Sequence, residues 1–89
     1  MKPGVLVRFD DKGFGFVDAR LFSYSIGHEN FSMDNWTGMI TRDTVCMVIA
    51  IVKISEDKWS RIMPDKSCAF VVTQDSRCGW IHEDWLKEL

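Results

Sequence analysis

Short runs in which apolar and polar residues alternate recur along this chain. Residues 5–9 carry apolar side chains at every second position, the spacing of a β-strand that buries one face. Two aspartates, a lysine and a glycine follow at residues 10–13, and these residue types form tight turns between strands. The alternation resumes over residues 14–17 with two phenylalanines. The pattern therefore predicts an N-terminal β-hairpin over residues 1–17.

The middle and the end of the chain differ in how clearly they indicate strands. Residues 18–42 mix aromatic residues with glycine, asparagine and aspartate, which predicts one long irregular loop. After it, a run rich in β-branched residues predicts a central strand over residues 45–53. Polar turns at 55–58, 64–67 and 74–77 separate the remaining strands, which are expected at 59–63, 68–73 and 78–82. A single helical turn is expected at residues 83–85.

Together these patterns predict an all-β protein, built as one small barrel of short strands. The 89 residues suffice for one domain, and 46% of them are hydrophobic and 12% aromatic. This composition is enough to close a core without help from a metal or a disulfide. The core is expected on the central strand and its neighbour, at Val45, Val48, Ile49, Ile51 and Phe70.

The net charge of the chain indicates which classes of partner it can attract. The chain has 11 Lys and Arg residues against 13 Asp and Glu, which gives a net charge of −2. A protein with this balance has no general attraction for phosphate groups or anionic lipid. Its longest apolar run, residues 45–52, is far shorter than the roughly 20 residues that span a bilayer. We therefore expect a cytoplasmic protein.

Candidate catalytic and metal-binding groups are sparse. The number of cysteines is odd and no C-x-x-C pair occurs, so neither a disulfide framework nor a zinc site is expected. The conceivable zinc ligands would be Cys68, Cys78, His28 and His82. The adjacent carboxylates at residues 83–84 point in different directions and do not form an acid–base pair. The sequence thus predicts a protein that is not an enzyme and binds no cofactor.

Two motifs near the C-terminus occur in a fixed order. An acidic turn at residues 56–57 leads to Trp59, and Gly79 opens a strand that ends in the aromatic turn residue Trp85. This arrangement resembles the second half of an SH3 domain, in which a strand with a solvent-facing tryptophan follows an acidic loop. The resemblance implies an SH3-like barrel. Residues 1–17 look like the hairpin added to short SH3-like proteins of tailed bacteriophages, which would place the protein in the host cytoplasm or the virion.

The SH3 resemblance implies a groove that binds a protein partner. Compared with SH3 domains, Trp59 looks like the tryptophan that faces the ligand, and Trp85 looks like the aromatic residue of the 3₁₀ turn. His82 stands at a position where SH3 domains usually have a proline. The implied contact residues are Trp59, Trp85, His82, Glu56 and Asp57. Acidic side chains of the flanking loops, Glu29 and Asp34 among them, favour ligands that carry Lys or Arg. The alternative interpretation of these acidic residues is an ordinary solvated surface.

A second resemblance concerns the N-terminal segment. Residues 12–17, Lys-Gly-Phe-Gly-Phe-Val, look like the aromatic strand of cold-shock domains. The resemblance implies single-stranded nucleic-acid binding through Phe14 and Phe16, with Lys12 and Arg8 beside them. The alternative, which the acidic net charge favours, is that both phenyl rings point into the barrel. A third hypothesis is a virion or assembly component whose surface packs only against copies of the same chain.

Overall fold

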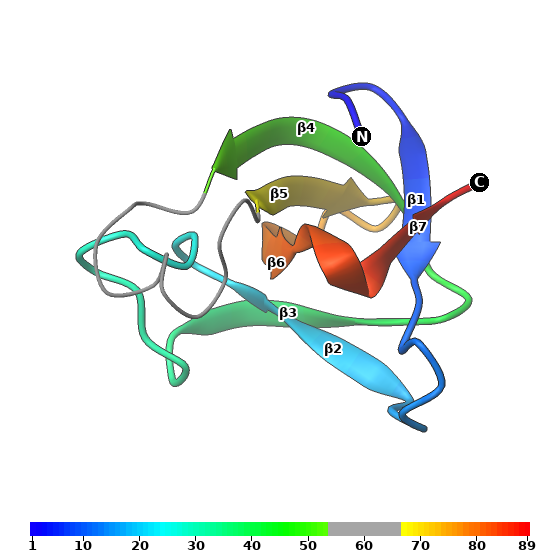
Figure 1. The fold of residues 1–89 in the computed structure, drawn as a ribbon, viewed down its shortest axis with the longest axis horizontal. Coiled ribbons are helices and arrows are strands. Elements are labelled where there is room, and N and C mark those ends of the chain that lie inside the picture. The colour runs from blue at the N-terminus through cyan, green and yellow to red at the C-terminus, as the bar shows by residue number, and fades with distance from the viewer. Residues whose placement is uncertain (54–66) are drawn as a thin grey trace.

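Seven strands, each antiparallel to its neighbours, form one curled sheet in the computed structural model, which describes residues 1–53 and 67–89 (Figure 1). The strands are β1 (Leu6–Phe9), β2 (Asp18–Phe22), β3 (Trp36–Thr41), β4 (Val45–Lys53), β5 (Ser67–Thr73), β6 (Cys78–His82) and β7 (Leu86–Glu88). One 3₁₀ turn, η1 (Glu83–Trp85), connects β6 to β7. The predicted all-β fold and the helical turn are therefore confirmed, whereas the strand predicted at residues 59–63 lies outside the described residues.

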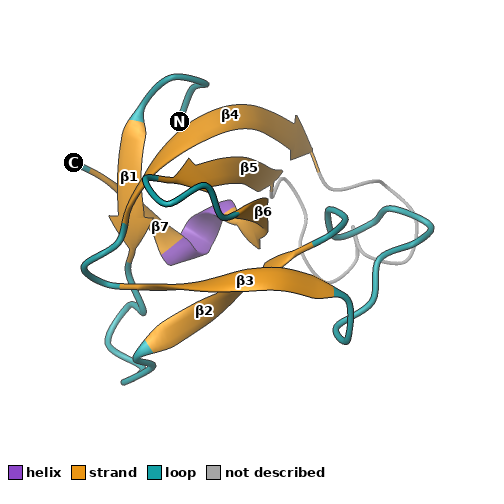
Figure 2. Ribbon diagram, turned by 180° about the vertical axis from the view of Figure 1, so that it is seen from behind, coloured by secondary structure: helices purple, strands orange, loops and turns teal. Residues whose placement is uncertain are grey.

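The strand order in the sheet is β3-β2-β6-β5-β4-β1-β7. Strands β4, β5 and β6 follow one another as a meander, and β1 lies between β4 and β7 near the two ends of the chain. Seen from either side, β4 and the β2–β3 pair form opposite walls, with β5 and β6 between them (Figures 1 and 2). The sheet thus closes part of the way into a small barrel.

The core fills the concave side of the curled sheet. Alternate residues along each strand point inward, as the pleat of a β-strand requires. The buried cluster consists of Val7, Phe9, Leu21, Ile40, Cys46, Val48, Ala69, Val71, Ile81 and Leu86. Every strand from β1 to β7 supplies at least one of these side chains. Half-buried side chains, among them Trp85, pack against the margin of this cluster.

The predicted N-terminal hairpin is wrong. Both edges of β1 are occupied by distant strands, because Val7 lies opposite Cys46 of β4 and opposite Glu88 of β7. Residues 10–17 form a loop instead of a returning strand. Two glycines of this loop, Gly13 and Gly15, have φ of 86°, a conformation that interrupts the extended chain.

The predicted long loop over residues 18–42 is also wrong at both of its ends. It contains β2 and β3, which pair with each other through Ala19 opposite Ile40 and Leu21 opposite Gly38. The irregular part is limited to residues 23–35. The pairing was hidden in the sequence because glycine and polar residues interrupt the apolar alternation of both strands, and the register shifts after Leu21.

The predicted core on β4 is confirmed at Val48, which is fully buried, and wrong at Ile49. The register between β4 and β5 shifts between Val48 and Ala50, so Ile49 is an extra residue in the strand. Its side chain points away from the core and is 47% exposed. Val45, Ile51 and Phe70 are half-buried.

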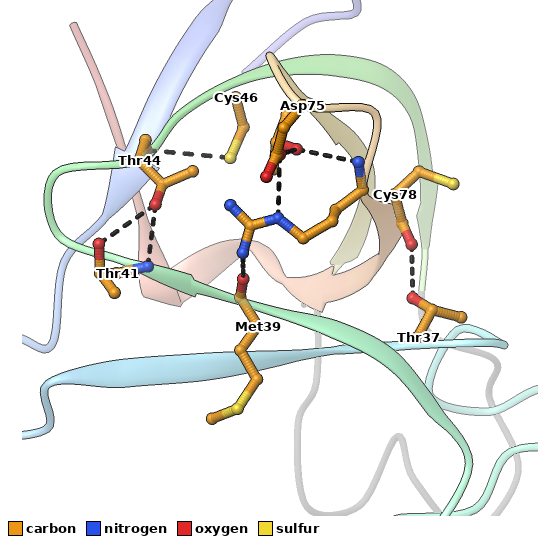
Figure 3. Close-up of polar contacts among 9 residues, drawn as sticks. Thr37, Met39, Thr41, Thr44, Cys46, Asp75 and Cys78 are labelled. Atoms are coloured by element: carbon orange, nitrogen blue, oxygen red, sulfur yellow. Dashed lines mark hydrogen bonds and ion pairs between the residues drawn. The ribbon is translucent and has the colours of Figure 1, made fainter.

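The free edge of β3 is blocked by side chains. The guanidinium of Arg77 donates a hydrogen bond to the backbone carbonyl of Met39, and its Nε lies 2.9 Å from the carboxylate of Asp75. At the end of the strand, the backbone N–H of Thr41 donates to the hydroxyl of Thr44 at 3.2 Å (Figure 3). Unpaired strand edges invite pairing with other chains, and these contacts occupy the groups that would do so.

Removing the Arg77 side chain should therefore loosen β3. We expect Arg77→Ala to lower the free energy of unfolding by about 1 to 2 kcal/mol, because a partly buried carbonyl and a carboxylate each lose a charged donor. Arg8→Ala, at an exposed arginine, should change it by less than about 0.5 kcal/mol. Urea unfolding gives both values. Faster amide exchange of β3 in Arg77→Ala is the second expected result, and equal stability of the two variants would show that the edge needs no such contact.

Candidate functional site

Three aromatic rings gather where the loop of residues 10–17 meets η1. The ring centroids of Phe14, Phe16 and Trp85 are separated by 5.8 to 6.3 Å, and we call this group the aromatic cluster. Phe14 is 72% exposed and Phe16 is 54% exposed. The expectation that both phenyl rings point into the barrel is therefore wrong. Large apolar side chains that remain in solvent beside one another are typical of contact surfaces.

A buried aspartate builds the loop that carries the two phenylalanines. The carboxylate of Asp11 accepts hydrogen bonds from the backbone N–H groups of Gly13 at 3.1 Å and Gly15 at 2.8 Å. The backbone N–H of Asp10 donates to the carbonyl of Trp85 at 2.8 Å, which ties the loop to η1. The sequence Asp-x-Gly-x-Gly thus turns the chain outward, and the rings between and after the glycines face solvent.

The same hydrogen bonds lower the pKa of the Asp11 carboxyl below its ordinary value of 3.8. The donor at Gly13 has the largest effect, burial opposes it, and the donor at Gly15 and the positive charge of Arg42, 3.6 Å away, lower the pKa further. A carboxyl group whose pKa is lower in the folded state than in the unfolded state stabilises the fold at pH values above its pKa in the unfolded state. This contribution is lost as the pH falls through the folded pKa.

Asp11→Asn should therefore be less stable than the parent protein at pH 7, and the difference should shrink as the pH falls from about 4 towards 2. The reason is that the parent carboxyl becomes protonated over this range. It then loses the stabilisation that comes from the ionised carboxylate, which the amide of the variant lacks at every pH. Urea unfolding at a series of pH values measures the difference. Asp34→Asn, at an exposed aspartate, is the control, and a difference for Asp11→Asn that stays constant with pH would contradict the assignment.

An apolar pocket of about 370 Å³ lies beside the aromatic cluster. Phe16 and Trp85 line one side of it, and Ile26 and Met33 from the loop of residues 23–35 line another. Met33 is 60% exposed. The rest of the lining comes from β1, β2 and β6 and consists of Phe9, Asp18, Ala19, Arg20, Phe22, Ile81 and His82. The pocket therefore combines exposed apolar side chains with few charges, as surfaces that accept an apolar side chain do.

His82 lines this pocket and also supports η1. Its Nδ1 accepts a hydrogen bond from the backbone N–H of Asp84 at 3.1 Å, so it caps the 3₁₀ turn that carries Trp85. The carboxylate of Asp84 lies 4.0 Å from the same nitrogen. The side chain is 9% exposed, which limits how much of it a ligand can touch. His82 thus positions the turn as well as lining the pocket.

The structure brings some of the predicted site residues together. His82 and Trp85 both line the pocket, whereas Trp59, Glu56 and Asp57 lie outside the described residues. The sequence did not indicate that Phe16, from the other predicted site, joins them. The pocket residues that it missed are Phe9, Asp18, Ala19, Arg20, Phe22, Ile26, Met33 and Ile81. No local pattern singles out these residues, because their place at the pocket depends on how distant segments of the chain pack together.

The remaining predicted nucleic-acid contacts lie outside the pocket. Lys12 is exposed, and its Nζ is 3.9 Å from the Asp10 carboxylate. Arg8 lies directly opposite Lys87 of β7, and both line a hollow of about 270 Å³ with Arg42. Asp10 and Asp43 line the same hollow. In the described part of the chain neither Arg8 nor Lys87 has an acidic partner.

The three cysteines are free. Cys46 and Cys68 are buried, and burial raises the pKa of both thiols, which keeps them protonated and unreactive. Cys78 is exposed. Among the described residues no group of three or more His, Cys, Asp or Glu side chains is placed to hold a metal ion. Cys68 and His82 are nevertheless cross-strand neighbours on β5 and β6.

Comparison with models of known protein families, with curated proteins and with solved structures finds no match to this chain. In the described ranges, no helix has the length and apolar character needed to cross a membrane.

Proposed function

We propose that this protein is a non-catalytic protein-binding module with an SH3-like barrel, and that its contact surface is the aromatic cluster with the adjoining pocket. The observation that carries the proposal is the exposure of Phe14 and Phe16 beside an apolar pocket that Trp85 also lines. Strand β6, which carries Gly79 as its second residue and leads into the 3₁₀ turn with Trp85, supports the SH3-like interpretation. The phage resemblance depended on the N-terminal hairpin, so a phage origin is no part of the proposal.

The partner would be a peptide segment with an apolar anchor and basic neighbours. The pocket volume suits one or two large apolar side chains, and Met33 is an adaptable residue that packs against varied shapes. The loop that carries Met33 also exposes Glu29 and Asp34, and Asp18 lies at the pocket itself. These carboxylates favour Lys or Arg beside the anchor, because complementary charges at the rim of an interface select the partner.

The test begins with selection of binding peptides from a random library displayed against the protein. We expect enrichment of an aromatic or large aliphatic residue with Lys or Arg nearby. Phe16→Ala should then weaken a selected peptide by about 30-fold or more, as loss of a central contact residue does. Val17→Ala is the matched control, since Val17 is 69% exposed on the same loop and lies outside the pocket lining. Equal affinity of both variants would contradict the proposed surface.

A second candidate function, single-stranded nucleic-acid binding, is favoured by the same exposed phenylalanines. Bases stack on such rings, at about 1 to 3 kcal/mol for each base. Arg8 and Lys87, which have no acidic partner among the described residues, supply positive charge on the neighbouring face of β1 and β7. Like charges directly opposite each other on a sheet destabilise it, and a bound phosphate would offset that cost. The net charge of −2 counts against general affinity for nucleic acid.

One double variant separates the two functions. Fluorescence anisotropy with an oligothymidine at low salt should show binding only if the second function holds. That binding should weaken steeply with salt and in the Arg8→Ser/Lys87→Ser double variant. Peptide binding by the same double variant should remain unchanged, because both side chains lie outside the pocket lining.

A further inference from the structure

The convex face of the sheet carries an apolar patch away from the pocket. Leu6 of β1, Met47 of β4 and Val72 of β5 lie opposite one another in register, so their side chains form one row across three strands. Leu6 is 46% exposed and Met47 is 42% exposed. Val45 and Ile49 share the outward positions of β4 with Met47. We call Leu6, Val45, Met47, Ile49 and Val72 the outer patch.

A hollow and a projecting side chain occur together on this patch. The hollow, about 270 Å³, is lined by Leu6, Val45, Met47 and Val72, together with Cys46, Thr73 and Gln74. Ile49 stands at the shift in register between β4 and β5, where an extra residue bends the strand, and 47% of it is exposed. Ile49 lies two residues from Met47 on the same face. The patch therefore carries both a hollow and, next to it, an exposed side chain whose size suits such a hollow.

We infer that the outer patch binds a second copy of this chain in a two-fold symmetric dimer, with Ile49 of each copy seated in the hollow of the other. A two-fold interface needs a surface that is complementary to itself, and a hollow beside a projecting residue meets that need. The hollow lining contains no charged side chain. The hollow itself therefore offers no charge to select a different partner, while Arg8 lies at its margin, opposite Val45. The net charge of −2 causes little repulsion between copies.

The area of the patch sets the strength of the dimer. The exposed fractions of Leu6, Met47 and Ile49 correspond to roughly 250 Å² per copy, so even with a surrounding rim the pair would bury at most on the order of 1,000 Å². This is the lower limit for a specific interface, so the dimer should be weak. We expect monomers at about 10 μM and mostly dimers near 1 mM, as weak interfaces of this size show. The inference is independent of the proposed function, because the two surfaces share no residue.

Sedimentation velocity over that concentration range tests the dimer with two charged variants. Ile49→Lys and Met47→Glu should each remain monomeric at 1 mM, because a charge would be buried in the hollow. An equimolar mixture of the two should dimerise again, since the introduced lysine of one chain would meet the introduced glutamate of the other. Circular dichroism confirms that each variant is folded, and Met47→Leu, which keeps the patch apolar, should dimerise like the parent.

Three results would overturn the inference. The parent protein could remain monomeric at 1 mM, or Ile49→Lys could dimerise as the parent does. Alternatively, Phe16→Ala, at the aromatic cluster, could abolish self-association while Ile49→Lys leaves it intact. The last result would place the contact between copies at the pocket and would leave the peptide-binding test to decide the proposed function separately.

Discussion

Replacing Gly79 with alanine is expected to destabilise this protein by about 3 kcal/mol, at the upper end of the range for an overpacked core. A Cβ atom at this position would lie 2.7 Å from the Cβ of Leu21, 2.7 Å from the Oγ1 of Thr37 and 3.0 Å from the carbonyl oxygen of Phe22. Leu21 is fully buried and has no room to move. Thr37 is exposed, but its hydroxyl shares one hydrogen between the backbone carbonyls of Leu21 and Cys78, so displacing it would break these contacts.

Gly38→Ala is the matched control for this prediction. A Cβ atom there would lie 3.5 Å from the Cδ of Arg77, an ordinary van der Waals distance to a flexible side chain. The substitution should lower the free energy of unfolding by less than about 1 kcal/mol, because a side chain restricts the unfolded chain and this gain offsets the small cost of moving Arg77. Urea unfolding at low micromolar concentration measures both variants. Equal stabilities would mean that β2 and β3 do not cross β6 as closely as the structure shows.

Val48→Ala and Ile49→Ala should have very different effects although the residues are neighbours on one strand. Val48 is fully buried, so its truncation should lower the free energy of unfolding by about 2 to 3 kcal/mol through lost burial and a residual cavity. Ile49 is about half exposed on the convex face, and its truncation should cost about 1 kcal/mol or less.

Chemical denaturation at low micromolar protein, where only monomer is present, compares these two variants directly. A larger loss for Ile49→Ala than for Val48→Ala would mean that Ile49, and not Val48, faces the core. It would also remove the basis for an outward Ile49 in the outer patch.

The later strands were predictable because their patterns are local. The predicted strand 45–53 coincides with β4, and 78–82 coincides with β6, since each is a run of strand-forming residues bounded by polar turns. The helical turn before the terminus was likewise signalled by two acidic residues at its start. The expectation fails at Ile49 because Val48 and Ile49 are neighbours on one strand and point to opposite faces, and only packing against the other strands decides which of these faces is the core.

The N-terminal part shows why pairing could not be predicted. The alternation at residues 5–9 correctly indicated a strand, but its partners lie about forty and eighty residues away in the sequence. The candidate site has the same limitation. The motif at residues 12–17 marked Phe14 and Phe16 as notable, yet their exposure depends on the Asp11 hydrogen bonds and on contact with Trp85. Only the pairing of β1 with β7 brings these parts together.

Two methionines report separately on the two surfaces, and they permit one decisive measurement. Met33 lines the pocket, and Met47 lies in the outer patch. With ¹³C-methyl-labelled methionine, titration of a library-selected peptide into dilute protein should shift the NMR signal of Met33 and leave that of Met47 unchanged. The same peptide should cause no shift in Phe16→Ala at equal concentration. A shift of Met47 with Met33 unchanged would contradict the account, because the partner would then bind the convex face instead of the aromatic cluster and its pocket.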